Sequence, residues 1–515
     1  MQTIILGLDG ANWDLLSPWI SSGKLNNIKE LKENGVVADH HSVLPPVTCP
    51  NWRAYSTGKN PGKLGVYWFE NIDTESQSLT LPNSESFKSK DMWDYMNADG
   101  QTCGVMNLPM SYPPRELDKL MVAGGPRSGD DGYTYPDELE EELESAFDYR
   151  VHPNNMITSN ENSEDEVTLI HELIETRFEA AKYLIDEYNP DVFHLTIFYI
   201  NVLQHYFWRD EPVEEAWEII DEYIGDMVDR AENVILLSDH GCAPVETVFN
   251  INAWLESEGY LTTNTTATDY LYKAGITQER MAKIARLTHM ERPIRKLLSQ
   301  KTLDLVPGSE GVKRHEKLKK VDWNETKAIA SGQGPIYLAI DKDDPEYESV
   351  RDEIISKLES LTDTRNGQQI ARAVYKAEEE YEGEYVSDGP DIIFDQEPGV
   401  HTSGAVGMDD VFEPRGKWKA ENVRTGLFLA SGPDFRTGQI DSTISITDIA
   451  PTILHALGHQ IPDDMDGTVI DVFQPDSEPG KSKPEFCTPI DRQSESRAAL
   501  QDEVARERLE DIGYL

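Results

Sequence analysis

The sequence predicts an α/β protein with a largely parallel central sheet. Short apolar runs of strand length alternate along the chain with longer segments whose apolar residues recur three and four positions apart. This alternation is typical of the strand–helix–strand units that build parallel sheets. Two of the apolar runs, 4–8 and 234–237, lead into an aspartate within two residues, and ligands of open α/β sheets collect beyond such strand ends.

These patterns predict the following strands and helices, given in chain order. The first strand is predicted at 4–8, a helix at 25–34, a short strand at 36–37 and a proline-rich loop at 44–48. Further strands are predicted at 102–106, 192–198, 234–237, 336–340, 392–394 and 425–430, and helices at 135–146, 166–188 and 214–227. No period of about 20 to 50 residues repeats, which argues against a solenoid.

The length predicts more than one structural unit. A chain of 515 residues exceeds the size at which a single hydrophobic core stops growing. We assign residues 1–252 and 321–490 to the main core, 253–320 to a smaller inserted helical cap, and 491–515 to a C-terminal amphipathic helix docked on the core.

The cap contains the one basic region that we find in the sequence. Between 279 and 320, twelve Lys or Arg residues stand against five acids. Such a region is most often a solvated helical face. The alternative is a lid that attracts an anionic substrate or makes contact with an anionic membrane surface.

Charge and cysteine content narrow the classes of partner. With 94 acidic and 47 basic residues, the net charge is −47, yet 38% of residues are hydrophobic, so a folded core is expected. This charge disfavours nucleic acid as a general partner and suits a salt-rich cytoplasm, so we expect a halophilic, cytoplasmic protein. The four cysteines show no CxxC spacing, which indicates neither disulfides nor a thiolate zinc site.

The residues at the two strand ends suggest a metal site. Asp9 is flanked by Gly7 and Gly10, and Asp239-His240 sits in a Ser-Asp-His-Gly turn after the second strand. Carboxylate oxygens and imidazole nitrogens are common ligands of divalent ions. The alternative for Asp9 is a helix cap, for which this residue type is equally suited.

Two further motifs carry candidate groups. Thr48 precedes Cys49-Pro50 at a loop-to-helix junction, where a metal ion and helix amides would be needed to make its hydroxyl a nucleophile. Asn201 and His205 are four residues apart, on one helical face, and both can point at one ion. Taken alone, each residue is more often structural.

Together these motifs resemble the alkaline phosphatase superfamily, and within it the type I phosphodiesterase/nucleotide pyrophosphatase group. The resemblance covers nearly the whole chain. The residues that carry it are Leu8-Asp9-Gly10, Pro45-Pro46-Val47-Thr48-x-Pro50-x-Trp52, Thr57-Gly58-Lys59-Asn60-Pro61-Gly62, Asn107-x-Pro109-x-x-Tyr112-Pro113-Pro114, Leu237-Ser238-Asp239-His240-Gly241, Asn252-x-Trp254-Leu255, Asp322-Trp323-x-x-Thr326-x-Ala328, Pro390-Asp391-Ile392 and Thr447-Asp448-Ile449-Ala450-Pro451-Thr452.

The resemblance implies an alkaline-phosphatase-like sheet flanked by helices, two neighbouring metal ions and a threonine nucleophile. It places one ion, Zn or Mn, on Asp9, Thr48, Asp239 and His240, with Thr48 attacking phosphorus. It suggests Asn107 and the backbone amide after Thr48 as groups that bind a phosphoryl oxygen. The implied substrate is a phosphate ester or diester. Sulfatases share the fold, but they need an oxidisable Cys or Ser where this chain has Thr48.

The second implied ion has an altered ligand set. Relatives in this superfamily usually supply Asp, His and a late His, whereas this chain has Asn201, His205 and Asn422. A neutral amide oxygen suits Mg²⁺ or Ca²⁺ better than zinc. We therefore expect this site to be depleted, absent or rebuilt for a harder ion. His401 is one candidate substitute, although a single loop histidine is more often exposed.

Three functions follow from these observations. The first is a metal-dependent phosphohydrolase, a phosphodiesterase or nucleotide pyrophosphatase with a depleted second site. The second is a phospho- or phosphoglycosyl transferase on lipid or glycan substrates, with the basic region meeting the anionic partner. The third is a weakly active or inactive homologue that binds ligand through the remaining ion. The sequence carries no signal for oligomeric state.

Overall fold

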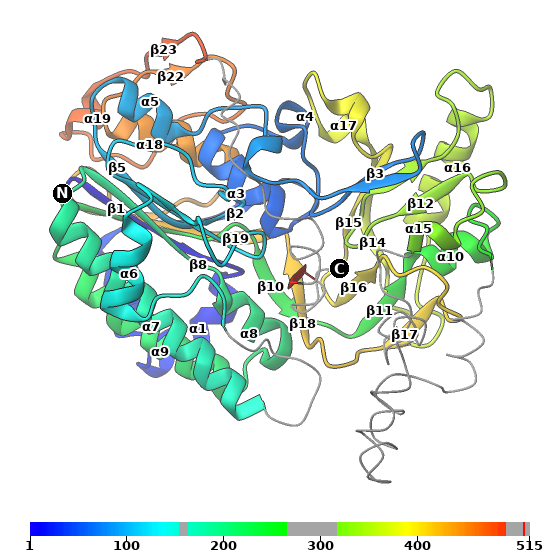
Figure 1. The fold of residues 1–515 in the computed structure, drawn as a ribbon, viewed down its shortest axis with the longest axis horizontal. Helices are drawn as coiled ribbons and strands as arrows, with labels where there is room; N and C mark the ends of the chain where they lie inside the picture. Colours follow the sequence, from blue (N-terminus) through cyan, green and yellow to red (C-terminus); the bar gives the residue numbers. More distant parts are fainter. Residues whose placement is uncertain (154–162, 265–316, 491–507, 510–515) are drawn as a thin grey trace.

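A ten-stranded, mostly parallel sheet forms the centre of the larger lobe (Figure 1). The computed structural model describes residues 1–153, 163–264, 317–490 and 508–509. The strand order is β20-β2-β19-β9-β1-β8-β5-β6-β7, with β21 pairing to β2. The strands are β1 (Thr3–Leu8), β2 (Val36–His41), β5 (Cys103–Pro109), β6 (Leu120–Gly124), β7 (Thr134–Tyr135), β8 (Val192–Ile197), β9 (Asn233–Leu237), β19 (Thr425–Ser431), β20 (Gly438–Gln439) and β21 (Ile444–Ser445).

Strand β1 shows why the sheet is covered on both faces. Its side chains alternate between two hydrophobic clusters: Ile4 and Leu6 belong to one, and Ile5 belongs to the other. Both neighbours of β1, β8 and β9, run parallel to it. A strand buried on both faces needs a continuous apolar run, which is the pattern that predicted it.

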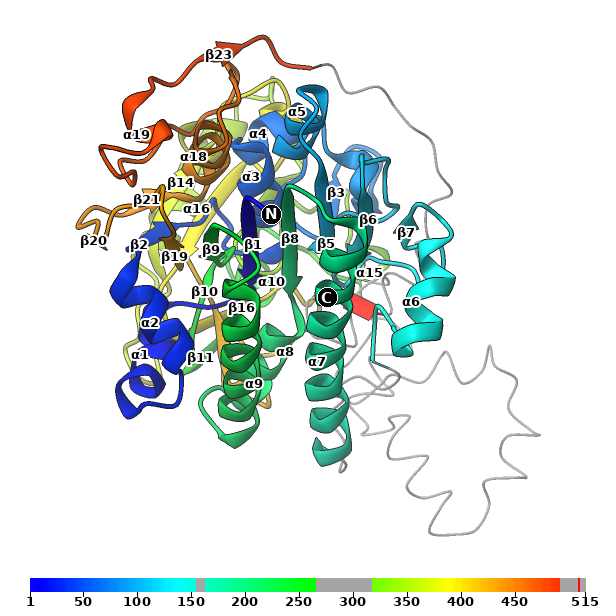
Figure 2. The same ribbon diagram turned by 90° about the vertical axis from the view of Figure 1, so that its left-hand side faces the viewer.

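Helices form the two covering layers (Figure 2). One layer packs against the Ile4–Leu6 side of the sheet, and the other packs against the Ile5 side. The first layer contains α1 (Trp13–Ser22), α2 (Asn26–Asn34), α6 (Leu139–Phe147), α7 (Ser163–Tyr188), α8 (Tyr199–Phe207) and α9 (Glu211–Val228), and the second contains α3 (Thr48–Thr57), α5 (Met92–Ala98) and α18 (Ile449–Ala456). The α/β class with a largely parallel sheet is therefore confirmed.

A second lobe has its own antiparallel sheet and its own hydrophobic cluster (Figure 1). Its sheet has the order β12-β13-β15-β14, and a three-stranded sheet, β16-β11-β17, lies beside it. These elements, with the helices packed on them, are β11 (Thr247–Asn250), α10 (Ile251–Ser257), β12 (Ala328–Ala330), β13 (Ile336–Leu338), α16 (Tyr347–Glu359), β14 (Ala371–Lys376), β15 (Ile392–Gln396), β16 (Val400–Ser403) and β17 (Phe412–Pro414).

A two-stranded ribbon joins the ends of the central strands to this lobe. It pairs β10 (Gly241–Pro244), which follows the Asp239-His240 turn, with β18 (Ala420–Val423). Shorter elements complete the chain: β3 (Asn71–Asp73), β4 (Ser78–Thr80), α4 (Pro61–Leu64), α15 (Lys317–Lys320), α17 (Ala377–Glu380), α19 (Glu478–Lys481), β22 (Ile461–Pro462), β23 (Phe486–Cys487) and the 3₁₀ turns 84–86, 386–388 and 446–448.

Several elements named from the sequence occur with small shifts of their ends. The helix expected at 135–146 begins at Leu139, because Thr134–Tyr135 pair as strand β7. Most of the basic cap and of the C-terminal helix lies outside the described residues, so the domain limits remain a prediction. Leu509, which is described, is fully buried in the core. Among the described residues, no helix is long and apolar enough to cross a bilayer.

Candidate active site

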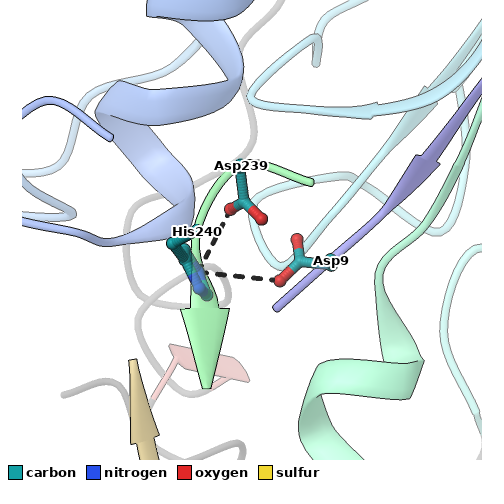
Figure 3. A group of neighbouring side chains, drawn as sticks. All are labelled: Asp9, Asp239 and His240. Carbon is teal, nitrogen blue, oxygen red and sulfur yellow. Dashed lines mark ion pairs between the residues drawn. The ribbon is translucent and has the colours of Figure 1, made fainter. Parts of the chain in front are cut away.

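The first group of candidate residues comes together at the carboxyl ends of β1 and β9 (Figure 3). Asp9, Asp239 and His240 each offer a ligand atom within 4.8 Å of the others, and all three are fully buried. His240 Nε2 lies 3.1 Å from Asp239 Oδ2 and 3.8 Å from Asp9 Oδ1. Parallel pairing of β1 with β9 produces this arrangement, because it sets both strand ends at one edge of the sheet.

Thr48 joins this group from α3. It is the first residue of that helix and is fully buried, with its Oγ1 3.4 Å from His240 Nε2. The helix keeps its first-turn amides near the same point, where they favour negative charge. Residues far apart in sequence, Asp9, Thr48 and Asp239-His240, thus surround one small volume, as the resemblance implied.

The carboxylates of this site fit a divalent cation. Asp9 Oδ1 and Asp239 Oδ2 are buried and have no hydrogen-bond partner, whereas buried polar atoms are nearly always satisfied. Burial, and then the charge of Asp239, raise the pKa of Asp9 well above its usual range. Burial raises the pKa of Asp239 to about 8 and lowers the pKa of His240 to about 3. A bound cation would reverse this penalty, because it favours ionised carboxylates and neutral imidazole.

Two groups outside the ligand set hold the carboxylates in place. Trp52 Nε1 donates a hydrogen bond of 2.8 Å to Asp9 Oδ2, and the Gly10 amide donates one of 3.2 Å to Asp239 Oδ1. Gly7 makes room for the indole, because a Cβ atom there would lie 2.5 Å from the Trp52 ring. The sequence placed Trp52 in a motif without giving it a role; only its contact with Asp9 reveals one.

The second candidate group lies next to the first. Gly10 adopts φ +69°, and a Cβ atom at this position would lie 2.2 Å from Asn201 Oδ1, so the amide packs directly against the residue after Asp9. Asn201 Nδ2 donates toward Asn422 Oδ1 at 3.4 Å, and Gln204 Nε2 donates to Asn201 Oδ1 at 3.1 Å. The two asparagines named from the sequence therefore meet, with amide–amide contacts between them.

His205 lies at the edge of this second group. Its Nδ1 hydrogen-bonds the Ala420 carbonyl at 2.8 Å, and its ring stacks on Trp418 with centroids 3.9 Å apart. Burial lowers the pKa of His205 to about 4, so the ring is neutral at physiological pH. The pairing of β18 with β10 brings Asn422 beside Cys242, two residues after His240.

Glu421 is a buried acid of this region that the sequence reasoning missed. Burial raises its pKa, but His401, His205 and the Asn422 amide outweigh that effect, so its pKa is lower than usual and it is ionised. His401 lies on strand β16, with its side chain 18% exposed and its Nδ1 paired with Glu421. In the sequence, Glu421 is marked only by its position directly before Asn422, and no motif predicts that it is buried.

Asn107 is the remaining candidate. It lies in β5 with φ +60°, its Oδ1 accepts a 2.9 Å hydrogen bond from Tyr149 Oη, and its Nδ2 donates to the Ala123 carbonyl at 3.5 Å. These two hydrogen bonds hold the side-chain amide of Asn107 in one orientation. Its role toward a phosphoryl oxygen stays a prediction.

Comparison with known families agrees with this geometry. Residues 3–425 match the family described as type I phosphodiesterase/nucleotide pyrophosphatase. The chain belongs to this family. The type I phosphodiesterases are phosphoric ester hydrolases that depend on divalent metal ions, and the cluster of Asp9, Asp239 and His240 provides a place for one. The resemblance drawn from the motifs is therefore confirmed.

Solved structures show the same fold at low sequence identity. Wild-type alkaline phosphatase PafA aligns with a TM-score of 0.54 and 14% identity over 92% of this chain and 99% of its own. Phosphonoacetate hydrolase from Sinorhizobium meliloti 1021, in complex with phosphonoformate, aligns with a TM-score of 0.51 and 14% identity over 89% and 95%. No curated protein sequence matched this type I phosphodiesterase. The alkaline-phosphatase-like architecture is thus shown by structure.

Proposed function

We propose that this protein is a metal-dependent phosphodiesterase or nucleotide pyrophosphatase in which Thr48 is the nucleophile. The observation that carries the proposal is the arrangement of Thr48, Asp9, Asp239 and His240 around one buried volume that holds two unsatisfied carboxylate oxygens. A divalent ion held there, zinc or manganese by its ligand set, would lower the pKa of the Thr48 hydroxyl.

The residues of the chain then have separate tasks. Asp9, Asp239 and His240 hold the ion, and Trp52 fixes the orientation of Asp9. Thr48 would release its hydroxyl proton to solvent and attack as the alkoxide, so that Oγ1 forms a bond to phosphorus as the bond to the leaving oxygen breaks. Water would then add its hydroxide to the phosphorus of the phosphothreonine as the bond to Oγ1 breaks, and its proton would restore the Thr48 hydroxyl. The N-terminal amides of α3 face the negative charge on the phosphoryl group.

The contacts of Asn201 and Asn422 support a second metal site that binds zinc poorly. Asn201 and Asn422 contribute neutral amides in place of a carboxylate and an imidazole, and the amides contact each other at 3.4 Å. Gln204 adds a further amide to the same network. Neutral oxygens leave Mg²⁺ or Ca²⁺ as the better-matched ion, so we propose one tightly held ion per chain and a weak second site at most.

The test combines metal analysis with hydrolysis assays. Elemental analysis of the purified protein should give one zinc or manganese per chain, and the protein should cleave p-nitrophenyl thymidine 5′-monophosphate faster than p-nitrophenyl phosphate. Thr48→Ala should reduce kcat by about 10³-fold or more while it keeps the bound ion. Failure of the wild-type protein to cleave either ester with Zn²⁺, Mn²⁺ or Mg²⁺ would refute the proposal.

Thr57→Ala is the matched control for Thr48→Ala. Thr57 lies at the other end of α3, is equally buried, and donates its hydroxyl hydrogen to the Arg53 carbonyl within the helix. Thr57→Ala removes the same side-chain atoms as Thr48→Ala and from the same helix, but at the end away from Asp9, Asp239 and His240. If both variants lost activity alike, the effect would be structural and Thr48 would not be the nucleophile.

A further inference from the structure

A largely buried loop presents Thr48 to the metal ligands. Residues 42–47 connect β2 to α3, and Thr48 is the first residue of that helix. Pro45 and Pro46 have no amide hydrogen to donate, so the loop can make few backbone hydrogen bonds of its own. Carbonyl groups in a buried loop need donors, and here side chains from other segments supply them.

Asn51 is the donor for three of these carbonyls. Its Nδ2 lies 2.9 Å from the carbonyl oxygens of Val47 and Pro45 and 3.3 Å from that of Val43. The side chain is fully buried, and in the described part of the chain its Oδ1 has no hydrogen-bond partner. The opposite orientation of the amide would set this oxygen against three carbonyl oxygens, so only the NH₂ group can face the loop.

The contact with Val47 fixes the start of α3. Val47 is the N-cap residue, and its side chain makes no capping hydrogen bond. Its carbonyl accepts from the backbone amide of Asn51 at 3.4 Å as well as from Nδ2. Because a peptide group is planar, holding the Val47 carbonyl also holds the amide and Cα of Thr48. Asn51 therefore controls the position from which Thr48 Oγ1 reaches to within 3.4 Å of His240 Nε2.

The other end of the loop is bound to the turn that carries the ligands. Ser42 Oγ donates to the Asp239 carbonyl at 2.7 Å, so the conformation of the loop sets the distance between Thr48 and this turn. Between the two ends, Tyr381 Oη donates to the Leu44 carbonyl at 2.7 Å. Tyr381 is buried and lies between β14 and β15, so the second lobe also holds the loop.

We propose that Asn51 is the positioning residue of Thr48, supported by Tyr381 from the second lobe. This inference rests on the proposed function. The two side chains hold residues 42–47 in the conformation that places Thr48 Oγ1 beside the metal ligands, and they act through the loop rather than through a contact with substrate. Attack at phosphorus requires a precisely placed nucleophile, and a displacement of about 1 Å can cost about 100-fold in rate.

Asn51→Ala tests this role with p-nitrophenyl thymidine 5′-monophosphate. The variant should lower kcat about 100-fold, because the loop loses three hydrogen bonds and Thr48 moves. The ligands themselves are unchanged, so KM and the zinc bound per chain should change less than about threefold. Asn51→Ser can still reach the carbonyl four residues earlier, that of Val47, and should therefore lose only about tenfold.

Asn252→Ala is the matched control for Asn51→Ala. Asn252 is also fully buried, and its Nδ2 also donates to backbone carbonyls, those of Ala330 at 2.8 Å and Gly404 at 2.9 Å. It lies in α10 of the second lobe rather than beside the nucleophile. Asn252→Ala should lower the melting temperature as Asn51→Ala does, but it should leave kcat unchanged.

Tyr381→Phe tests the support from the second lobe. It removes only the hydroxyl that binds the Leu44 carbonyl, and it should lower kcat about three- to tenfold, the value of one hydrogen bond. Tyr67→Phe is its control. Tyr67 is buried in the same small cluster and donates to the Tyr385 carbonyl instead of the loop, so this variant should keep the wild-type kcat.

A double variant separates positioning from general destabilisation. Because Asn51 acts through Thr48, adding Asn51→Ala to Thr48→Ala should change the residual rate less than about threefold. A residue that only stabilises the fold would lower the rate alike with and without Thr48.

The results separate this inference from the proposed function. If the wild-type protein cleaves the ester and Thr48→Ala does not, but Asn51→Ala keeps its kcat or loses as much as Asn252→Ala, the inference is wrong and the proposed function stands. Equal losses from Asn51→Ala with and without Thr48 would also overturn the inference alone. If the wild-type protein cleaves no ester, or if Thr48→Ala keeps its rate, both are wrong. Should Asn51→Ala fail to fold, Asn51→Ser and Tyr381→Phe decide, and full activity of both would refute the inference.

Discussion

The hydrogen bond from Trp52 to Asp9 offers a quantitative test of the metal site. Trp52→Phe keeps an aromatic ring in the core but removes the Nε1–H group that lies 2.8 Å from Asp9 Oδ2. A hydrogen bond to a charged group is worth about 1.5–3 kcal/mol. At about 1.4 kcal/mol per tenfold change, its loss should weaken metal binding roughly 10- to 150-fold, in the range typical for outer-shell partners of metal ligands.

Trp93→Phe is the control for this measurement. Trp93 is fully buried in the same hydrophobic cluster and packs on the same two rings, Tyr55 and His194, as Trp52 does. Its Nε1 has no hydrogen-bond partner. Trp93→Phe therefore removes the same volume without removing a hydrogen bond to a ligand.

Calorimetric titration of the metal-free variants with Zn²⁺ and Mn²⁺ is the assay. Trp52→Phe should bind more weakly than Trp93→Phe by the factor given above, while the two variants unfold at similar temperatures. Equal metal affinities for the two variants would show that the indole N–H does not orient Asp9 for an ion, and the reasoning that treats Asp9 as a ligand would lose its support.

Three further predictions follow from the charges of the site and of the surface. In the metal-free protein, the pKa of Asp239 is raised to about 8, and the pKa of Asp9 is raised as well. The folded state therefore keeps protons on these carboxyl groups, whereas the unfolded chain releases them at about pH 4. The free energy of unfolding should therefore fall as pH rises from 7 to 8, by up to about 1.4 kcal/mol per carboxyl. Urea unfolding with a chelator measures this, and Asp239→Asn or added Zn²⁺ should flatten the slope. The double variant Asn201→Asp with Asn422→His should raise bound zinc from one to two ions per chain by elemental analysis, and an unchanged count would mean that the amides are not what limits the second site. Because the net charge is −47, the melting temperature should rise as KCl is raised from 0.1 M toward 2 M, and a melting temperature that stays constant would contradict a halophilic origin.

Much of the fold could be predicted because its strands are buried on both faces. Segments 4–8 and 234–237 contain no polar side chain, and 192–198 is apolar except for His194 and Thr196, a pattern typical of central strands in a covered sheet. The second lobe was harder to predict. Its strands β12 and β13 are three residues long, so each gives only a short apolar signal: the strand predicted at 336–340 contains β13, whereas β12 was not predicted.

The first candidate metal site could be predicted from the sequence for a related reason. Asp9 and Asp239-His240 directly follow such strands, and parallel neighbours end at the same edge, so local sequence already implied their proximity. The sequence by itself also indicated the family, whose match covers residues 3–425. It further predicted a second ion site altered by Asn201 and Asn422.

Only the tertiary structure decided which other side chains lie around the candidate site. Trp52 reaches Asp9 from 43 residues away, and Glu421 collects donors from β16, from the loop before β13 and from its own strand. No spacing rule connects such residues, because Trp52 meets Asp9 where α3 packs on the central sheet, and Glu421 meets His401 where β18 lies next to the second lobe. The candidate metal site could thus be inferred from local pattern, whereas the side chains that surround it depend on contacts between distant segments.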